Sequence, residues 1–334
     1  MLILGIESTC DETACALVED GRTILSNVVS SQIDLHKEFG GVVPELACRR
    51  HVDVMLPVID QALKEAGKTL KDVDAIAVAR GPGLIGALLL GIQTAKTLSF
   101  ALSKPLVGVN HIEAHLYAAI MSHNKEVTFP ALGAVLSGGH TALVLIKHLG
   151  HYHLIGQTID DAVGEAFDKV AKMLHLPYPG GPQIEQLAKQ GNPKKYPLKP
   201  GRVKDKPFDF SFSGLKTAVL YGAFGQNVTE RRSLTEQEVR DVAASFQAVA
   251  LKDIVDKTMM AAKEHQCKTI IFGGGVTNNM KLREMFSSPE HEYLWPSNGL
   301  SLDNAAMIAG LGYHKFRDGE VSGLGLEAAT SISF

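Results

Sequence analysis

Two histidines four residues apart, His111 and His115, are the strongest candidates for metal chemistry in this 334-residue sequence. A helical turn takes about 3.6 residues, so both rings would project from one helix face and could share a metal ion. A zinc peptidase helix carries its catalytic glutamate directly after the first histidine. Here the glutamate is Glu113, which a helix would turn roughly 200° away from His111. The spacing predicts a metal site without a peptidase's base; a chance pair at a helix start is the competing interpretation.

Three turns rich in glycine or hydroxyl side chains each follow a predicted strand, at residues 8–13, 137–141 and 273–279. Such turns expose backbone N–H groups, which can bind phosphate oxygens. Any one of them could be an ordinary hairpin or helix cap, but three in matching strand contexts favour phosphate binding. The first two lie between paired strands at the start of each half of the chain, which indicates a duplicated architecture.

Predicted strands and helices alternate along the chain, as is typical of an α/β protein. Apolar runs predict strands at residues 2–7, 13–18, 75–79, 106–109, 131–136, 141–146 and 269–272. Apolar residues at helical spacing predict helices at residues 44–66, 85–102, from 111 onward, 161–174, 240–262 and 303–316. Pro57 should kink the first of these helices or begin a new one.

Composition limits the possible functions. Apolar residues make up 45% of the chain and charged residues 21%, which is typical of a globular protein. No apolar run reaches the ~18 residues of a membrane span, and the N-terminus reads as a strand rather than a signal peptide. The four cysteines form no Cys-x-x-Cys pair, which favours the cytoplasm. The net charge of −3 excludes a nucleic-acid field over the whole molecule, so any RNA contact needs a local patch.

One segment could supply that patch. Residues 177–206 are rich in Pro, Gly and Lys, which predicts loop with one short helix. From residue 194 to residue 206, Asp205 is the one acidic residue among six cationic ones: Lys194, Lys195, Lys199, Arg202, Lys204 and Lys206. A solvated loop is the alternative interpretation.

A set of motifs, in chain order, resembles the TsaD family, the universal transferases of tRNA threonylcarbamoyladenosine synthesis, formerly called glycoproteases. The motifs are Gly5-Ile-Glu-Ser-Thr-Cys-Asp-Glu-Thr13, Gly40-Gly-Val-Val-Pro-Glu-Leu-Ala47, Gly81-Pro-Gly-Leu-Ile-Gly86, His111-x-Glu-x-His115, Leu136-Ser-Gly-Gly-His-Thr141, Asp160-Asp-Ala-Val-Gly-Glu-Ala-Phe-Asp-Lys169, Tyr178-Pro-Gly-Gly-Pro182 and Asp209-Phe-Ser-Phe-Ser-Gly-Leu-Lys216. The resemblance covers nearly the whole chain. It is closer to the bacterial form, because no kinase domain is fused.

The resemblance implies an α/β fold of the actin-like ATPase (acetate and sugar kinase) type, duplicated into two domains with an interdomain cleft. We expect a first actin-like domain at residues 1–130 and a second, with the nucleotide-binding turns, at 131–302. The C-terminal helix and tail, residues 303–334, should pack back on the first domain.

The resemblance also implies the reaction. A threonylcarbamoyl group passes from threonylcarbamoyl-adenylate to N6 of the adenosine 3′ of the anticodon, in tRNAs that read codons starting with A, and AMP is released. The donor is an activated mixed anhydride, so positioning and charge stabilisation can suffice without a nucleophilic side chain. Expected partners are tRNA, the paralogous TsaB and the ATPase TsaE, in the cytoplasm and without a membrane. Leu84, Leu88 and the helix around Met55 could offer the surface for the paralogue.

Residue roles follow from the same resemblance. His111, His115 and Asp303 would hold one divalent metal ion, Fe²⁺ in preference to Zn²⁺, although Asp303 also reads as the N-cap of the last helix. Asn110 is not expected to be a ligand. Asp11 and Glu12 are candidates for orienting or deprotonating the attacking amine. The residues expected to bind the adenylate are Val135, Leu136, Ser137, Gly138, Gly139, Asp168, Gly181, Glu185 and Asn279.

Two details of this assignment stay open. Glu185 stands where the family often has Asp, and its carboxylate should keep the ribose contact. His140 follows the glycines of the second turn, where a structural role is as plausible as a catalytic one.

Other functions compete. A small-molecule kinase or ATPase could have the same fold, but phosphoryl transfer prefers magnesium with oxygen ligands over a histidine pair. A metallopeptidase is disfavoured by the position of Glu113. A non-catalytic scaffold would be marked by loss of His111 and His115, which are both present.

Overall fold

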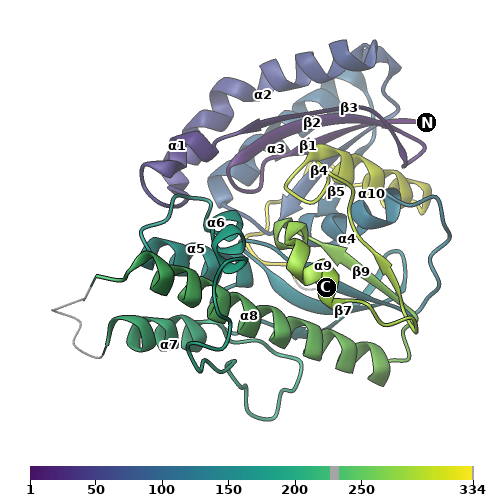
Figure 1. The fold of residues 1–334 in the computed structure, drawn as a ribbon. Coiled ribbons are helices and arrows are strands. Elements are labelled where there is room, and N and C mark those ends of the chain that lie inside the picture. Colours follow the sequence, from purple (N-terminus) through teal and green to yellow (C-terminus); the bar gives the residue numbers. More distant parts are fainter. Residues whose placement is uncertain (226–232, 333–334) are drawn as a thin grey trace. The chain divides into compact units, whose positions relative to one another are not determined.

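The computed structural model describes residues 1–225 and 233–332. The chain divides into two compact units (Figure 1). Unit 1 contains residues 1–126 together with 294–334, and unit 2 contains residues 127–293. The chain therefore leaves unit 1 once, builds unit 2, and returns.

Unit 1 is built on a five-stranded sheet of order β3-β2-β1-β4-β5. Its strands are β1 (Leu2–Glu7), β2 (Glu12–Glu19), β3 (Thr23–Ser31), β4 (Ala75–Gly81) and β5 (Leu106–Asn110). β2 is antiparallel to both β1 and β3, whereas β4 is parallel to β1 and β5 is parallel to β4. The carboxyl ends of β1 and β5 thus point the same way, which brings the residues that follow them to one edge of the sheet.

The helices of unit 1 are α1 (Ile33–Lys37), α2 (Pro44–Ala66), α3 (Ile85–Leu102), α4 (His111–Met121) and α10 (Ala305–Arg317). Gly67 ends α2 in the left-handed conformation, as the sequence indicated. Pro57 lies inside α2, so it starts no new helix. The bounds of α3 match the prediction from apolar spacing.

Side chains of β1 alternate between the two faces of the sheet. Leu2, Leu4 and Ile6 belong to a core cluster with apolar residues of α2 and α3. On the other face, Gly5 lies against α10, where a Cβ would be 2.5 Å from the carbonyl oxygen of Ala305. The period of two places Glu7 on the same face as Gly5, toward α10. A strand that is buried on both faces therefore ends in a buried carboxylate.

Unit 2 repeats the plan. Its sheet has the order β10-β9-β6-β7-β8, formed by β6 (Ala131–Leu136), β7 (Thr141–His148), β8 (His151–Gln157), β9 (Thr269–Gly273) and β10 (Glu292–Leu294). β6 and β7 form the antiparallel hairpin that β1 and β2 form in unit 1, and β9 is parallel to β6 as β4 is to β1. The predicted duplication is confirmed.

The helices of unit 2 are α5 (Val163–Met173), α6 (Gly180–Ala188), α7 (Ser213–Phe224), α8 (Glu236–Glu264) and α9 (Met280–Met285). Thr235 and Glu238 form a capping box at the start of α8, which begins before the predicted position. The strands β3, β8 and β10 and the helices α1, α7 and α9 were not predicted. β3 and β8 are the partly exposed edge strands, and neither has the apolar run that marks a buried strand.

Among the described residues, α3 is the one helix long and apolar enough to cross a membrane by length and composition. Its residues Leu88, Ile92 and Ala95 belong to the core cluster of unit 1. Because this face packs against the sheet of its own unit, we interpret α3 as a core helix.

Candidate active site

The helix α4 begins where β5 ends, and the junction fixes the first histidine. Asn110 is the N-cap: its side-chain oxygen accepts hydrogen bonds from the N–H groups of Ile112 (2.9 Å) and Glu113 (3.5 Å). The side chain of Asn110 is thus used to cap the helix. His111 and His115 are both buried, and their ring centroids lie 4.6 Å apart. One turn of one helix thus presents both imidazoles together, as their spacing predicts.

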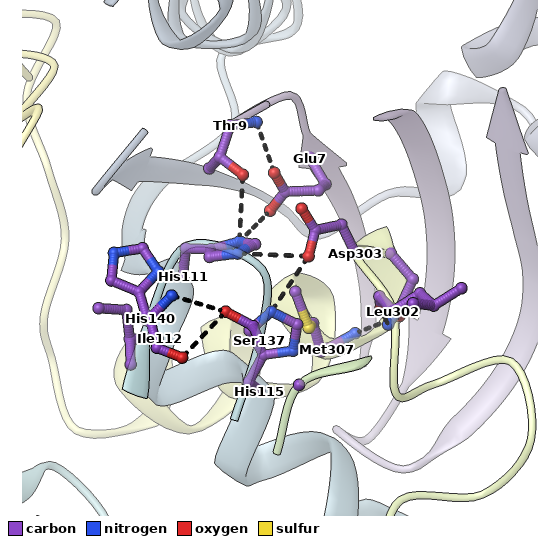
Figure 2. Close-up of polar contacts among 12 residues, drawn as sticks. Glu7, Thr9, His111, Ile112, His115, Ser137, His140, Leu302, Asp303 and Met307 are labelled. Carbon is purple, nitrogen blue, oxygen red and sulfur yellow. Dashed lines mark hydrogen bonds and ion pairs between the residues drawn. The ribbon is translucent and has the colours of Figure 1, made fainter. Parts of the chain in front are cut away.

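Asp303 does not cap α10, and that prediction was wrong. The N-cap is the next residue, Asn304, whose side-chain oxygen accepts a hydrogen bond from the N–H of Met307 at 3.1 Å. Asp303 is therefore free to face the histidines (Figure 2). Its Oδ1 lies 3.1 Å from Nε2 of His115 and 3.5 Å from Nε2 of His111.

These three side chains fit a metal ion. One ligand atom from each of His111, His115 and Asp303 lies within 4.8 Å of the others. Nδ1 of His115 is buried and has no hydrogen-bond partner among residues 1–225 and 233–332. Two imidazoles and a carboxylate suit iron or zinc and leave coordination positions open for other groups.

The charged groups of this cluster shift one another's pKa values. Burial would lower the pKa of His111, but the carboxylates of Glu7 and Asp303 outweigh it and hold that pKa well above its ordinary value. Burial would likewise raise the pKa of Asp303, but His111 and His115 hold it well below its ordinary value. Protons therefore compete with a cation for Nε2 of His111.

The turn after β1 carries the candidate catalytic carboxylates, and a buried histidine of α2 holds it. Nδ1 of His51 lies 2.6 Å from Oγ1 of Thr13, and its Nε2 lies 2.9 Å from the carbonyl oxygen of Cys10. Sequence reasoning missed His51, because nothing in the pattern of α2 separates it from the core residues beside it. Burial, reinforced by the carboxylates of Asp303 and Asp11, raises the pKa of Glu12 to about 9. Glu12 therefore carries a proton near neutral pH in the metal-free chain.

The second turn, between β6 and β7, is closed by its own hydrogen bonds. The N–H of Ser137 donates to the carbonyl of His140 (2.8 Å), and the N–H of His140 donates to Oγ of Ser137 (3.0 Å). The start of α5 lies directly against this turn, since a Cβ on Gly164 would be 2.8 Å from Ser137 O and from Gly138 Cα. The first N–H groups of α5 already have partners here: Val163 donates to Oγ1 of Thr141 at 2.8 Å, and Gly164 donates to the carbonyl of Ser137 at 3.2 Å. The groups that remain for a phosphate are therefore those of the turn itself.

The third turn, after β9, packs on the second. Gly274 has φ +92°, and a Cβ there would lie 2.5 Å from the carbonyl oxygen of Leu136. Val135 and Leu136 are themselves fully buried in β6. Their side chains belong to the core, so only their backbone could contact a ligand. The structure thus brings the predicted residues 135–139 and the turn at 273–279 together within unit 2.

Asp168 and Gly181 meet at the start of α6. Oδ1 of Asp168 accepts the N–H of Gly180 at 2.7 Å. Burial raises the pKa of Asp168 to about 6, although the N–H groups of Gly180 and Gly181 act in the opposite direction. A carboxylate with this pKa changes charge just below neutral pH.

Glu185 and Asn279 meet at the start of α9, and both have partners in the protein. Oε1 of Glu185 accepts the N–H of Met280 at 2.9 Å. The Asn279 amide donates to Gln247 (2.8 Å), and its oxygen accepts the N–H of Leu282 (3.0 Å). Their roles toward adenine and ribose therefore remain predictions. Asn279 would have to exchange a partner to contact a ligand through its side chain.

The cationic segment at residues 194–206 is irregular in structure, and its six cationic side chains are all exposed. Its start is anchored to α8: Asn192 donates its N–H to Asp241, and Tyr196 donates its N–H to Ser245. The predicted exposed loop is confirmed, and its contact with RNA remains a prediction.

The geometry disfavours a peptidase. Glu113 shares a polar cavity of about 300 Å³ with Arg80, Lys315 and Glu320, apart from the histidine pair. Burial raises the pKa of Glu113 to about 6. Its carboxylate does not belong to the group of side chains that could hold the metal. A base beside the metal, as a peptidase needs, is not supplied from α4.

Comparison with known proteins identifies the family. Residues 23–310 match the family model TsaD, tRNA N6-adenosine threonylcarbamoyltransferase. A protein of that name from Protochlamydia amoebophila is 65% identical over 320 residues, covering 95% of this chain and 93% of the relative. The Bacillus subtilis protein of the same name is 49% identical over 96% of this chain and 92% of the relative.

Solved structures support the fold class. The crystal structure of a ROK hexokinase from Thermus thermophilus is similar with a TM-score of 0.51 and 16% identity, over 96% of this chain and 100% of the hexokinase. At that identity the likeness shows the fold alone, and it confirms the predicted actin-like α/β architecture. The sequence matches carry the assignment further: this chain belongs to the TsaD family of tRNA N6-adenosine threonylcarbamoyltransferases.

Proposed function

We propose that this chain transfers a threonylcarbamoyl group from threonylcarbamoyl-adenylate to N6 of the adenosine 3′ of the anticodon, in tRNAs that read codons starting with A, and releases AMP. Family membership makes the chain an acyltransferase that modifies tRNA. The convergence of His111, His115 and Asp303 supports the proposal most directly, because it supplies a site for positive charge without a peptidase's base.

Unit 2 would bind the adenylate. The backbone N–H groups of Gly138 and Gly139 suit the phosphate. The carboxylate of Asp168 can accept hydrogen bonds from ribose hydroxyls, and Gly181 leaves open space because a Cβ there would meet nothing within 4 Å. Val135 and Leu136 would contribute backbone groups, with Glu185 and Asn279 supporting the adenine side through the start of α9.

Unit 1 would hold one divalent ion, with His111, His115 and Asp303 as ligands and Fe²⁺ preferred to Zn²⁺. When bound, the ion supplies a Lewis acid that can polarise the acyl carbonyl or bind the threonine carboxylate and hydroxyl. The chain's own residues orient the reactants, since an activated anhydride needs placement and charge stabilisation more than a nucleophile. Asp11 and Glu12 are proposed to orient or deprotonate the attacking amine. Glu12 can accept a proton only after its raised pKa is lowered, for example by a nearby cation.

The tRNA would contact residues 194–206 through its phosphates, since an irregular cationic loop can follow a backbone without reading bases.

The paralogue TsaB would cover α2 and α3. The expectation for this surface was wrong for Leu88, which is buried in the core of unit 1, whereas Leu84 is half-buried and the helix around Met55 does have an exposed face. Val52 and Leu56 on α2 and Ile85 and Leu89 on α3 are exposed instead. TsaE as a further partner and a cytoplasmic location belong to the same proposal.

One reconstitution tests the reaction. The purified chain, loaded with Fe²⁺ or Zn²⁺, is mixed with threonylcarbamoyl-adenylate and an unmodified tRNA, with and without TsaB and TsaE. We expect AMP release and a mass increase on the adenosine 3′ of the anticodon, weak for the chain alone and strong with both partners. Release of AMP without modified tRNA under every condition would contradict the proposal. Phosphorylation of a sugar or another small molecule from ATP would favour the kinase alternative.

A further inference from the structure

The end of β1 places a buried carboxylate behind the first metal ligand. Glu7 has no exposed surface, and its Oε2 lies 2.9 Å from Nδ1 of His111. Its other oxygen, Oε1, accepts the N–H of Thr9 at 2.6 Å. Figure 2 shows the resulting series of interactions from Thr9 through Glu7 and His111 to Asp303. A carboxylate so placed can only accept from the ring, so Nδ1 of His111 carries the hydrogen.

This interaction gives the two histidines different hydrogen-bonding environments. Nδ1 of His111 is held by Glu7, while Nδ1 of His115 has no hydrogen-bond partner within the described part of the chain. When the hydrogen is fixed on Nδ1, the lone pair is on Nε2, the atom that faces Asp303. A carboxylate behind a metal-bound imidazole also raises its basicity and fixes the orientation of the ring.

The fold does not require this carboxylate. Leu136 ends β6 at the equivalent place in unit 2, and there the same hairpin is built with an apolar side chain. A fully buried carboxylate is costly unless it is paired. The carboxylate occurs in unit 1 alone and lies directly behind a candidate ligand. We therefore infer that it has a role other than folding.

We propose that Glu7 is the positioning residue of the metal site: it accepts the Nδ1 hydrogen of His111 and so presents Nε2 of His111 as the tighter of the two imidazole ligands. The inference rests on the proposed metal site. It concerns how strongly the ion is held and through which ring atom, and both can be measured without the transfer reaction.

The first experiment measures Zn²⁺ affinity by chelator competition and records the visible spectrum of bound Co²⁺, in the full chain at alkaline pH, where protons compete least for imidazole. Glu7→Gln keeps the size of the side chain and removes its charge. We expect Zn²⁺ to bind about 10–100-fold more weakly, as is usual when the partner of a metal-bound histidine is removed. The Co²⁺ bands should also shift.

Ser8→Ala is the matched control. Ser8 is the next residue, also buried, and its hydroxyl donates to the carbonyl of Ala87 at 3.0 Å, away from the histidines. This variant also loses a buried hydrogen bond but should keep the parent's metal affinity and Co²⁺ spectrum. Equal weakening in both variants would show a merely structural role and overturn the inference.

The second experiment needs no substitution of Glu7, so a Glu7→Gln chain that fails to fold does not matter. In the zinc-loaded parent with isotope-labelled histidine, magnetic resonance should show a proton on Nδ1 of His111 and the metal on Nε2, assigned with His111→Ala. Metal on Nδ1 would overturn the inference. A parent that binds no zinc would contradict the proposed metal site itself, whereas zinc bound equally well by parent and Glu7→Gln would contradict only the role of Glu7.

Discussion

Units 1 and 2 begin with the same hairpin but lead it into turns of opposite chemistry. β1 and β6 occupy the same place in sheets of the same order. β1 ends in Glu7 and enters a turn that carries Asp11 and leads to Glu12 at the start of β2, whereas β6 ends in Leu136 and enters a turn with Gly138 and Gly139. The first turn offers carboxylates and the second offers backbone N–H groups. A duplicated scaffold can thus separate cation chemistry from anion binding without changing its topology.

The largest expected effect is loss of metal binding in unit 1 without any change of AMP binding in unit 2. His111→Ala or His115→Ala should remove bound metal and lower transfer by about 10²–10³-fold, the usual cost of losing one charge-stabilising element. AMP binding should not change, because the glycine turns lie in unit 2. Elemental analysis, AMP calorimetry and the transfer assay check this together. Full metal occupancy in the double variant would disprove the assignment of these ligands.

A substitution in unit 2 should do the opposite and weaken AMP binding without affecting the metal. Gly164→Ala places a Cβ 2.8 Å from Ser137 O and Gly138 Cα. Because both neighbouring atoms are backbone, the turn has to shift, and overpacking of this kind costs about 1–3 kcal/mol. We expect AMP affinity to fall about tenfold or more while metal content stays at the parent's level. Gly214→Ala in α7, where a Cβ would meet nothing within 4 Å, is the control. Unchanged AMP affinity in Gly164→Ala would place the phosphate elsewhere.

A pH series sharpens the contrast. The pKa of Asp168 is raised to about 6 by burial, so its carboxylate is ionised at neutral pH and becomes protonated as the pH falls through that value. An ionised carboxylate is the better acceptor for ribose hydroxyls, so AMP affinity should decline below pH 6, by at most about tenfold per pH unit. Asp168→Asn should bind weakly at every pH, without this step. Calorimetry over a pH series, with thermal melts to confirm folding, measures it. The same decline in both proteins would exclude Asp168 as its cause.

The smallest expected effect is on tRNA affinity and should leave the metal site and the AMP site intact. Replacing Lys194, Lys195, Lys199 and Arg202 together by Ala should weaken tRNA binding nearly independently of sequence. The slope of log K against log salt should flatten by up to about 0.7–0.9 for each phosphate that the loop no longer neutralises. Metal and AMP binding should stay unchanged. Filter binding or fluorescence titration over a salt series measures both affinity and slope.

The control for that experiment is an equal reduction of charge elsewhere on the surface. Lys37, Lys64, Lys68 and Lys71 are all exposed in unit 1 and can be replaced by Ala together. If that variant loses as much tRNA affinity as the loop variant, the effect is one of net charge, and the loop has no special role in binding tRNA.

The sequence predicted the buried elements better than the edges. Strands at 2–7 and 131–136 and the helix at 85–102 have the predicted bounds, because a run of apolar residues marks burial directly. β3 and β8 were missed because an exposed edge strand need not be apolar. Helix ends were off by a few residues for a related reason, since several neighbouring side chains can cap a helix equally well.

In the candidate site, too, the sequence could not predict every side-chain contact. Asp303 and Asn304 are adjacent and both are good N-caps, so sequence could not decide which of them caps α10. The offset of one residue determines whether the Asp303 carboxylate faces its own helix or the histidines. The role of Glu7 could not be predicted for another reason. Its partner His111 is 104 residues away, and the sequence around a strand residue does not show which distant residues it contacts.

The return of the chain to unit 1 has a consequence for biosynthesis. His115 and Asp303 are 188 residues apart, and all of unit 2 is made between them. A ribosome has therefore finished nearly the whole protein before the third ligand exists, and a chain that stops within unit 2 lacks both Asp303 and α10. The proposed metal site is thus completed late in synthesis, and a chain that stops within unit 2 lacks one of its three side chains.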